Sequence, residues 1–235
     1  MSREAIVLAG GLGTRLKHLL DDLPKPMAPV GGKPFLTYLL SCLESEGIER
    51  VILSIGYESE KIIDHYGDKF NSLEIIYSAE DTPLGTGGAI KKSLDHCNED
   101  HVFVVNGDTY FDISFDIMRN AFLAKRPSLL IALCKMNSVD RYGTVEIDDK
   151  GMVMAFKEKS FKESALINGG IYLMKTDMLL DLDLPDRFSF EKDIMEKHIN
   201  SKSIMAIPFD NYFIDIGVPE DFYKAQKELP SFFYV

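Results

Sequence analysis

The sequence predicts an α/β protein with a mixed, mostly parallel central sheet and helices on both faces. Short apolar runs typical of buried strands alternate with amphipathic segments of helical spacing over about the first 140 of the 235 residues. Strands that alternate with helices in this way usually form a parallel sheet with helices packed on its faces. The composition, 46% hydrophobic and 27% charged, is that of a folded globular chain.

The first half of the chain contains most of this alternation. An apolar run at residues 4–9 ends in Gly10-Gly11 and predicts a buried strand that leads into a loop. Residues 34–46 have apolar side chains at helical spacing, a proline at the first turn and Gly47 after the last, so they predict a helix. The same patterns predict strands over residues 51–55, 74–78, 101–105 and 128–135, and helices over residues 59–70, 87–96 and 113–124.

Beyond Asp140 strands become more frequent. Two alternating segments around Asp149-Lys150-Gly151 predict a hairpin over residues 142–157. No repeat, low-complexity segment or long linker interrupts the chain, so we expect one domain over residues 1–235 whose character changes near residue 140. Further strands are predicted over residues 168–174, 203–207 and 212–216, and helices over residues 189–200 and 219–228.

The charge and the cysteine content exclude several classes of protein. The chain has 26 basic and 37 acidic residues, a net charge of −11, which disfavours binding to nucleic acid. No apolar run is long enough to cross a membrane, and the N-terminus lacks the features of a secretory signal. The three cysteines have neither a disulfide framework nor paired metal spacing. We therefore expect a cytoplasmic protein whose cysteines are reduced and which binds neither nucleic acid nor a membrane.

A glycine-rich loop follows the first predicted strand. Three glycines and Arg15 lie in the segment Leu8-Ala9-Gly10-Gly11-Leu12-Gly13-Thr14-Arg15-Leu16. Glycines let backbone N–H groups surround a phosphate, and a guanidinium fork suits phosphate oxygens. The spacing fits neither the dinucleotide fingerprint nor the Walker pattern. By itself this segment is either an anion site or an ordinary glycine-rich turn; residues 1–33 carry a net charge of +2, which favours the anion site.

A lysine between two prolines comes shortly afterwards, in Leu23-Pro24-Lys25-Pro26-Met27. Each proline favours an extended conformation at the residue before it, so Lys25 has a defined direction. Such a lysine suits a phosphate, although a surface lysine between prolines is the simpler interpretation when the segment is taken alone.

Together with Gly32-Lys33-Pro34, these two segments resemble the signature of the sugar-1-phosphate nucleotidyltransferases, or nucleotide-sugar pyrophosphorylases. The resemblance continues along nearly the whole chain. Its further segments are Pro83-Leu84-Gly85-Thr86-Gly87-Gly88-Ala89, Val105-Asn106-Gly107-Asp108, Tyr142-Gly143-Thr144-Val145, Lys157-Glu158-Lys159, Asn168-Gly169-Gly170-Ile171-Tyr172, and Phe213-Ile214-Asp215-Ile216-Gly217 with Pro219-Glu220-Asp221.

The resemblance implies the Rossmann-like fold of nucleotide-diphospho-sugar transferases, and the absence of hexapeptide repeats predicts no β-helix domain. In the family, a sugar 1-phosphate oxygen attacks the α-phosphorus of a nucleoside triphosphate and pyrophosphate leaves. About residues 1–140 would bind nucleotide and about residues 141–235 the sugar phosphate. The implied substrates are GTP and a sugar 1-phosphate, and a homodimer is left open.

The resemblance also assigns roles to residues. Arg15 and Lys25 would neutralise the triphosphate, and Asp108 and Asp215 would hold one Mg²⁺. The implied nucleotide-binding residues are Leu8, Ala9, Gly10, Gly11, Gly13, Thr14, Glu80, Pro83, Gly85 and Thr86. The implied sugar-phosphate-binding residues are Asn106, Gly143, Glu158, Lys159, Asn168, Gly169 and Arg187.

The sequence around three carboxylates bears on whether they bind a metal or the base. Asp108 follows an apolar strand, at the end where open α/β sheets bind ligands, although Gly-Asp is also a common turn. Asp215 lies among apolar strand residues and, if buried, needs a partner or a metal. Glu80 precedes residues 83–89, which resemble the base-binding loop of the family and are called the base loop here. A carboxylate at this place can accept both adjacent donors of guanine but repels the carbonyls of uracil and thymine. Glu80 therefore favours GTP, unless Glu80-Asp81 is only a solvated turn.

Four of these segments are most similar to the branch of the family that transfers GMP to a heptose 1-phosphate, which implies a GDP-heptose product for a bacterial surface glycan. They begin at Leu23, Pro83, Asn168 and Phe213. Mannose 1-phosphate or another sugar 1-phosphate is the alternative acceptor. A regulatory subunit that binds nucleotide sugars without catalysis is the alternative of another class.

Overall fold

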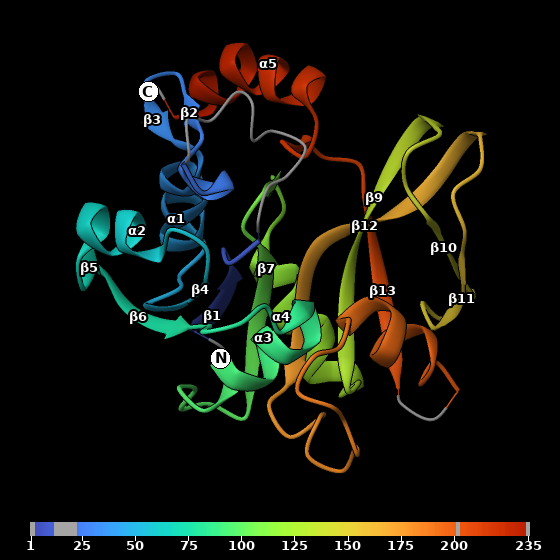
Figure 1. Cartoon of the computed structure of the whole chain (residues 1–235). Helices are drawn as coiled ribbons and strands as arrows, with labels where there is room; N and C mark the ends of the chain where they lie inside the picture. The colour runs from blue at the N-terminus through green and yellow to red at the C-terminus, as the bar shows by residue number, and fades with distance from the viewer. Residues whose placement is uncertain (1–2, 12–22, 201–202, 234–235) are drawn as a thin grey trace.

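The computed structural model describes residues 3–11, 23–200 and 203–233. Its main sheet contains β1 (Glu4–Leu8), β4 (Arg50–Ile55), β5 (Lys69–Phe70), β6 (Leu73–Ala79), β7 (His101–Asn106), β9 (Leu129–Val139), β10 (Thr144–Ile147), β11 (Val153–Lys157), β12 (Lys162–Lys175) and β13 (Ile204–Phe209). The strand order is β11-β10-β12-β7-β1-β4-β6-β5, and β9 and β13 extend the sheet from β12 (Figure 1). Strands β7, β1, β4 and β6 are parallel, whereas β12 joins β7, β9 and β10 antiparallel.

Helices cover both faces of this sheet, as the sequence predicts. The helices of the described residues are α1 (Phe35–Ser45), α2 (Ser59–Tyr66), α3 (Gly85–Leu94), α4 (Phe115–Lys125), α5 (Pro219–Glu228), the short 3₁₀ helices η2 (Lys25–Met27) and η4 (Leu229–Phe232), and the π-helix η3 (Phe190–Glu196). Successive strand side chains point to opposite faces. Ala5 and Val7 of β1 pack with α1, α2 and α4, while Ile6 packs with α3 and η3. Because both faces are covered, the central strands are continuous apolar runs.

A third apolar cluster joins the C-terminal segment to the first helix. Phe222 and Ala225 of α5 pack with Phe35 and Tyr38 of α1, and Ile214 of the last described strand lies in the same cluster. Two short antiparallel pairs complete the fold: β2 (Pro29–Val30) with β3 (Lys33–Pro34), and β8 (Thr109–Phe111) with β14 (Phe213–Asp215). Figure 1 shows α5 beside β2 and β3, above the carboxyl ends of the parallel strands. This packing brings the motif around Asp215 to that edge of the sheet.

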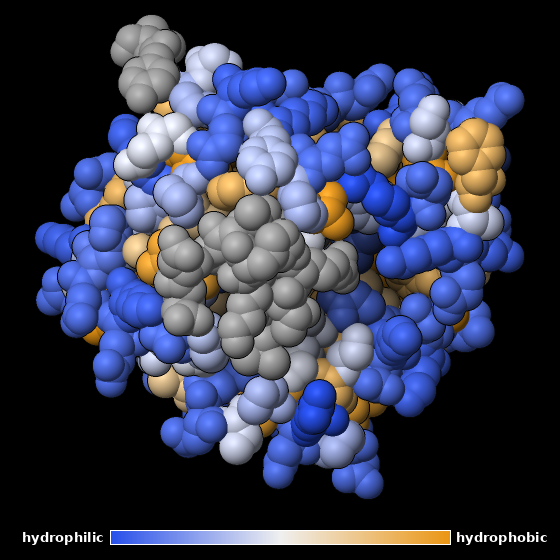
Figure 2. All heavy atoms as spheres, turned by 45° about the horizontal axis from the view of Figure 1, so that its top comes forward, coloured by the Kyte–Doolittle hydropathy of each residue, from blue (hydrophilic) through white to orange (hydrophobic). Residues whose placement is uncertain are grey.

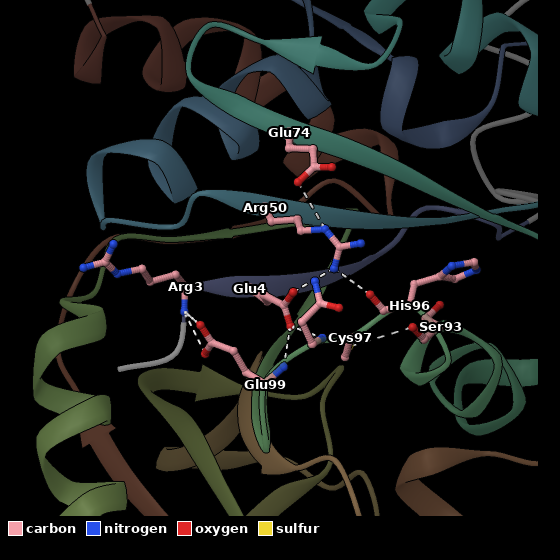
Figure 3. A network of polar contacts seen from close by, with 9 residues as sticks. Arg3, Glu4, Arg50, Glu74, Ser93, His96, Cys97 and Glu99 are labelled. Carbon is pink, nitrogen blue, oxygen red and sulfur yellow. Dashed lines mark hydrogen bonds and ion pairs between the residues drawn. The ribbon is translucent and has the colours of Figure 1, made fainter.

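The opposite, amino-terminal edge is held by a buried ion pair (Figure 3). Glu4, only 4% exposed, accepts a 2.7 Å hydrogen bond from Arg50 and bonds of 2.8 and 3.1 Å from the backbone N–H groups of Asn98 and Glu99. Arg50 also contacts Glu74, at 3.2 Å. The group ties the beginnings of β1, β4 and β6 to the segment that precedes β7, far from the edge that carries the predicted site.

Two predicted elements are wrong in part. The helix expected over residues 59–70 ends at Tyr66, because Gly67 takes a φ of +61° and the chain turns into β5. The helix expected over residues 189–200 is a π-helix from Phe190 to Glu196. By contrast, α5 has the predicted bounds, with Pro219 at its first position. Within the described residues, no helix is long and apolar enough to span a membrane.

Candidate active site

The predicted nucleotide site lies where the parallel strands end. Leu8 at the end of β1 is in register with Ser54 of β4 and with Asn106 of β7, and Glu80 follows β6 directly. This is the edge at which open α/β sheets bind ligands. A pocket of about 480 Å³ opens there, lined by Leu8, Gly10, Gly11, Lys25, Pro26, Ser54, Glu80, Pro83, Gly85, Thr86, Ala89, Asn106, Asp108 and Glu191. Figure 2 looks onto this side of the molecule, whose surface is largely hydrophilic.

Ten of these residues are ones that the sequence predicts. Ala9 does not line the pocket: its side chain is buried and its N–H donates to the Ser54 carbonyl at 2.8 Å. Gly13, Thr14 and Arg15 lie outside the described residues, so their predicted roles stay predictions.

The base loop is fixed against a segment from the second half of the chain. Gly85 has a φ of +72°, and a Cβ there would lie 2.6 Å from the carbonyl oxygen of Phe188, so only glycine fits. The N–H of Gly87 donates to that carbonyl, and the N–H of Phe188 donates to the carbonyl of Leu84, both at 3.0 Å. The start of α3 therefore has a defined position above the sheet.

Glu80 presents its carboxylate to the pocket. One oxygen accepts the N–H of Leu84 at 2.8 Å, and the other lies 3.3 Å from the Ser54 hydroxyl. Gly10 faces the same carboxylate, because a Cβ on Gly10 would lie 3.1 Å from Glu80 Oε1. A carboxylate has about four acceptor positions, so both oxygens can still accept hydrogen bonds from a ligand. The side chain is therefore part of the pocket and also orders the turn after β6.

A second carboxylate in the pocket, Glu191, was missed. It accepts hydrogen bonds from the hydroxyls of Thr86, at 2.7 Å, and Ser189, at 2.8 Å. Thr86 in turn accepts the N–H of Phe190 at 2.9 Å. Ser54, Pro26 and Ala89 complete the lining and were also missed. Ser54 could have been found from its place at the end of a predicted parallel strand, but in the sequence Glu191 resembles any solvent-facing residue of an amphipathic segment.

Lys25 and the two predicted metal aspartates form one cluster. Lys25 Nζ lies 2.5 Å from Asp108 Oδ2 and 3.9 Å from Asp215 Oδ1. Burial raises the pKa of Asp215, the Asp108 carboxylate raises it further, and the Lys25 ammonium opposes both effects. The hydroxyl of Tyr142 also reaches Asp215, at 3.5 Å. The cluster is thus two facing carboxylates with one internal cation.

The β8–β14 pair explains how residues so far apart in the chain meet. Thr109, next to Asp108, pairs with Asp215, and the N–H of Ile216 donates to the Asp108 carbonyl at 3.0 Å. The N–H of Gly217 donates to Asp215 Oδ1 at 2.7 Å, which orients that carboxylate. Local backbone pairing therefore sets the distance between the two carboxylates.

The donor set fits Mg²⁺. Mg²⁺ prefers oxygen ligands and is usually held by one or two carboxylates together with water and substrate phosphates. Within residues 3–11, 23–200 and 203–233, no three His, Cys, Asp or Glu side chains gather as a metal-binding group. A pair of carboxylates such as Asp108 and Asp215 suits an ion that takes its other ligands from water and a substrate.

The predicted sugar-phosphate residues divide into two sets. Asn168 and Gly169 lie beside the pocket, at an irregularity of β12 next to Asn106: a Cβ on Gly170 would lie 2.7 Å from Asn106 Nδ2. Asn168 donates to the Tyr172 hydroxyl at 2.8 Å and accepts the N–H of Gly170 at 3.0 Å. These contacts fix the orientation of the Asn168 amide, and Gly170 packs against the Asn106 side chain.

The second set does not line the pocket. Glu158 and Lys159 follow β11 and are exposed, and Gly143 packs against the backbone of Lys157 at the end of that strand. Arg187 is exposed, between Asp186 and Phe188, which contact the start of α3. It therefore lies near the base loop, and its assignment to the sugar phosphate stays a prediction.

The chain is similar to known proteins along nearly its whole length. The model of the nucleotidyl transferase family matches residues 4–231. The D-glycero-alpha-D-manno-heptose 1-phosphate guanylyltransferase of Campylobacter jejuni is 47% identical over 94% of this chain and 97% of its own length. The protein of the same name from Aneurinibacillus thermoaerophilus is 44% identical over 97% of this chain and 99% of its own length.

The chain is also similar to a solved structure over nearly its whole length. The crystal structure of HddC from Yersinia pseudotuberculosis complexed with GMP-PN has a TM-score of 0.86 and 38% identity, and covers 96% of this chain and 98% of that chain. With a family model that matches nearly all of its residues, this chain belongs to the nucleotidyl transferase family.

Proposed function

We propose that this chain transfers GMP from GTP to D-glycero-α-D-manno-heptose 1-phosphate, giving GDP-heptose and pyrophosphate. The observation that carries the proposal is the cluster of Lys25, Asp108 and Asp215 beside the pocket that Glu80 lines. The identity of 47% and 44% to two proteins named for this reaction, over nearly their full lengths, supports the acceptor.

Glu80 supports guanine as the base. Guanine presents N1–H and the 2-amino group side by side, and the Glu80 carboxylate can accept both. Uracil and thymine would turn carbonyl oxygens toward the same negative charge. The carboxylate is held toward the pocket by Leu84 N–H and the Ser54 hydroxyl, so it cannot turn away from a wrong base without losing those bonds.

Catalysis needs the two polyanions to be brought together and the developing charge to be neutralised. Lys25 binds oxygens of the triphosphate, and Arg15 supplies a second cation. Asp108 and Asp215 would hold a Mg²⁺ ion, which would supply charge neutralisation for the reacting phosphates. The sugar-phosphate oxygen attacks the α-phosphorus, and the bond from that phosphorus to pyrophosphate breaks.

The acceptor would lie on the β12 side of the pocket. Asn106 and Asn168 have amide groups there that suit sugar hydroxyls. Gly143, Gly169, Glu158 and Lys159 do not line the pocket, but they would contact the acceptor when it is bound, and Lys159 would supply the cation for its phosphate. Arg187 serves as an additional cation from the base-loop side. The product would be made in the cytoplasm and used for a bacterial surface glycan.

Two alternatives are distinguishable. Mannose 1-phosphate as acceptor would keep every residue role and change only the sugar. A non-catalytic regulatory subunit has no need of the charged cluster, so the presence of Lys25, Asp108 and Asp215 together favours an enzyme.

The test is pyrophosphate release with Mg²⁺ across GTP, ATP, CTP, UTP and dTTP, each with the heptose 1-phosphate and with mannose 1-phosphate. Release with GTP and the heptose alone supports the proposal. Release with GTP and mannose 1-phosphate alone keeps the mechanism and discards the acceptor. Absence of release from every pair would favour another sugar 1-phosphate as acceptor first and the regulatory subunit second.

A further inference from the structure

The ammonium of Lys25 lies where a metal ion shared by Asp108 and Asp215 would lie. Nζ is 2.5 Å from Asp108 Oδ2 and 3.9 Å from Asp215 Oδ1. A Mg²⁺ ion would stand about 2.0–2.1 Å from a carboxylate oxygen, so an ion bound to Asp108 Oδ2 from the same side would overlap the ammonium, which lies farther from Asp215. The lysine side chain is only 13% exposed, so water screens the contact weakly.

The surroundings hold the ammonium in place. A Cβ on Gly217 would lie 3.2 Å from Lys25 Nζ and 2.8 Å from Asp215 Oδ1, so the backbone of Gly217 closes one side of the cluster. The backbone of Lys25 is fixed as well, because Ala28 N–H donates to its carbonyl at 3.0 Å and the adjoining Pro26 is buried. A movement of the ammonium therefore requires rotation of the Lys25 side chain on a fixed backbone.

Two cations cannot share this space, because they repel each other strongly at such short range. Lys25 and Asp108 also line the pocket proposed for the nucleotide. A bound triphosphate would offer the ammonium new anionic partners within reach of its long side chain. The two carboxylates would then lose their internal cation at the moment when metal-bound phosphates arrive.

We propose that Lys25 is a built-in competitor of the divalent metal: it neutralises Asp108 and Asp215 in the free enzyme and releases them when a nucleoside triphosphate binds. Metal affinity is therefore low without nucleotide, and nucleotide and metal bind as a coupled pair. This inference rests on the proposed metal role of the two aspartates. It adds that the metal binds tightly only together with the nucleotide.

The experiment measures Mn²⁺ binding by electron paramagnetic resonance, with no turnover. Lys25→Met removes the charge and keeps the side-chain length, whereas Lys25→Arg keeps a cation. Lys224→Met, on the surface of α5, is the matched control. Each protein is titrated alone and again with the α,β-methylene analogue of GTP, whose α–β bond cannot be broken. Thermal melting verifies that each variant is folded.

Without nucleotide, Lys25→Met should bind Mn²⁺ at least about tenfold more tightly than the wild type, since a neighbouring positive charge is removed. Lys25→Arg and Lys224→Met should bind it as weakly as the wild type. The analogue should strengthen Mn²⁺ binding strongly in the wild type and much less in Lys25→Met.

Two results would overturn the inference, and they differ in what they leave standing. In the first result, wild type and Lys25→Met bind Mn²⁺ equally without nucleotide, but each protein with the analogue holds one more Mn²⁺ than the analogue alone. The metal role of the two aspartates would then be kept, and the competition by Lys25 would be rejected. If no protein holds that additional Mn²⁺, the metal role of Asp108 and Asp215 fails and the competition fails with it.

Discussion

The hydroxyl of Thr86 donates a 2.7 Å hydrogen bond to the carboxylate of Glu191, which lies 105 residues further along the chain. The same hydroxyl oxygen accepts the N–H of Phe190 at 2.9 Å. One small side chain therefore joins the start of α3, which carries the base loop, to the start of the π-helix η3. Both sides of the nucleotide pocket depend on this contact.

Replacing Thr86 with valine should weaken GTP binding. Valine has the same shape but neither donates nor accepts, so Glu191 and the Phe190 N–H lose a partner. A net loss of about 1 kcal/mol corresponds to roughly a fivefold rise in the KM for GTP. Steady-state kinetics measures it, with Thr176→Val as control, because Thr176 follows β12 and does not line the pocket. An unchanged KM for GTP would show that the contact does not shape the site.

Glu80→Gln should reduce the preference for GTP. An amide accepts at one end only and can donate to a pyrimidine carbonyl, so discrimination against UTP should fall by roughly tenfold or more. The ratio of kcat/KM for GTP and UTP measures it. Asp81→Asn is the control, because Asp81 is the exposed neighbour. The same nucleotide ranking in Glu80→Gln would mean that the base is read elsewhere, by backbone groups near Leu8 and Gly85.

Asp108→Asn should lower the rate by on the order of 10²-fold or more, since a metal-binding charge is lost at the transition state. The measurement is kcat at saturating Mg²⁺ and both substrates. Asp112→Asn is the control, because Asp112 is exposed at the end of β8 and does not face the pocket. Turnover close to that of the wild type would contradict the metal assignment.

Glu4→Ala should reduce the free energy of unfolding by about 3 kcal/mol, because it leaves Arg50 and two backbone N–H groups without their buried carboxylate. Glu49→Ala removes the exposed Arg3–Glu49 pair instead and should cost less than about 1 kcal/mol. Urea unfolding measures both. Equal losses from the two variants would mean that the buried group in Figure 3 contributes no more than a surface pair.

The three cysteines should be unreactive in the folded enzyme. Burial raises the pKa of Cys134 to about 11 and the pKa values of Cys42 and Cys97 to about 12, from an ordinary value of 9.0. A thiol with a raised pKa keeps its proton longer in the folded state. Its contribution to stability is therefore complete below about pH 9 and is lost as the pH rises toward about 12.

Alkylation with iodoacetamide at about pH 8 checks this, because only the thiolate reacts. The native protein should stay unmodified and the urea-unfolded protein should take up label at all three cysteines. In parallel, the free energy of unfolding should decline once the pH exceeds about 9. Fast labelling of the native protein would contradict the burial of these thiols.

Local sequence signals predicted the elements whose ends carry a strong residue preference. Pro219 begins α5 and Gly47 follows α1, and both helices have the expected place. Gly67 carries the same kind of signal, but the predicted helix was continued past it to Phe70, whereas the chain turns there into β5. The π-helix of η3 was not predictable, because its apolar positions fit an α-helix equally well.

The site likewise contains residues that the sequence predicted and others that it could not. Lys25, Asp108 and Glu80 stand out because each follows a proline or a strand end, and all three line the pocket. Glu191 depends on a contact between segments that only the folded chain brings together. The internal ion pair of Lys25 was likewise beyond the sequence, because it depends on the pairing of β8 with β14.

The measurement that tests the account most directly is identification of the product by ³¹P NMR after incubation with GTP, Mg²⁺ and D-glycero-α-D-manno-heptose 1-phosphate. The account predicts two coupled diphosphate resonances of GDP-heptose, formed at the same rate as pyrophosphate and on the order of 10²-fold more slowly with Asp108→Asn. Persistence of the unreacted heptose 1-phosphate signal, under conditions in which mannose 1-phosphate or another nucleotide is consumed, would contradict it.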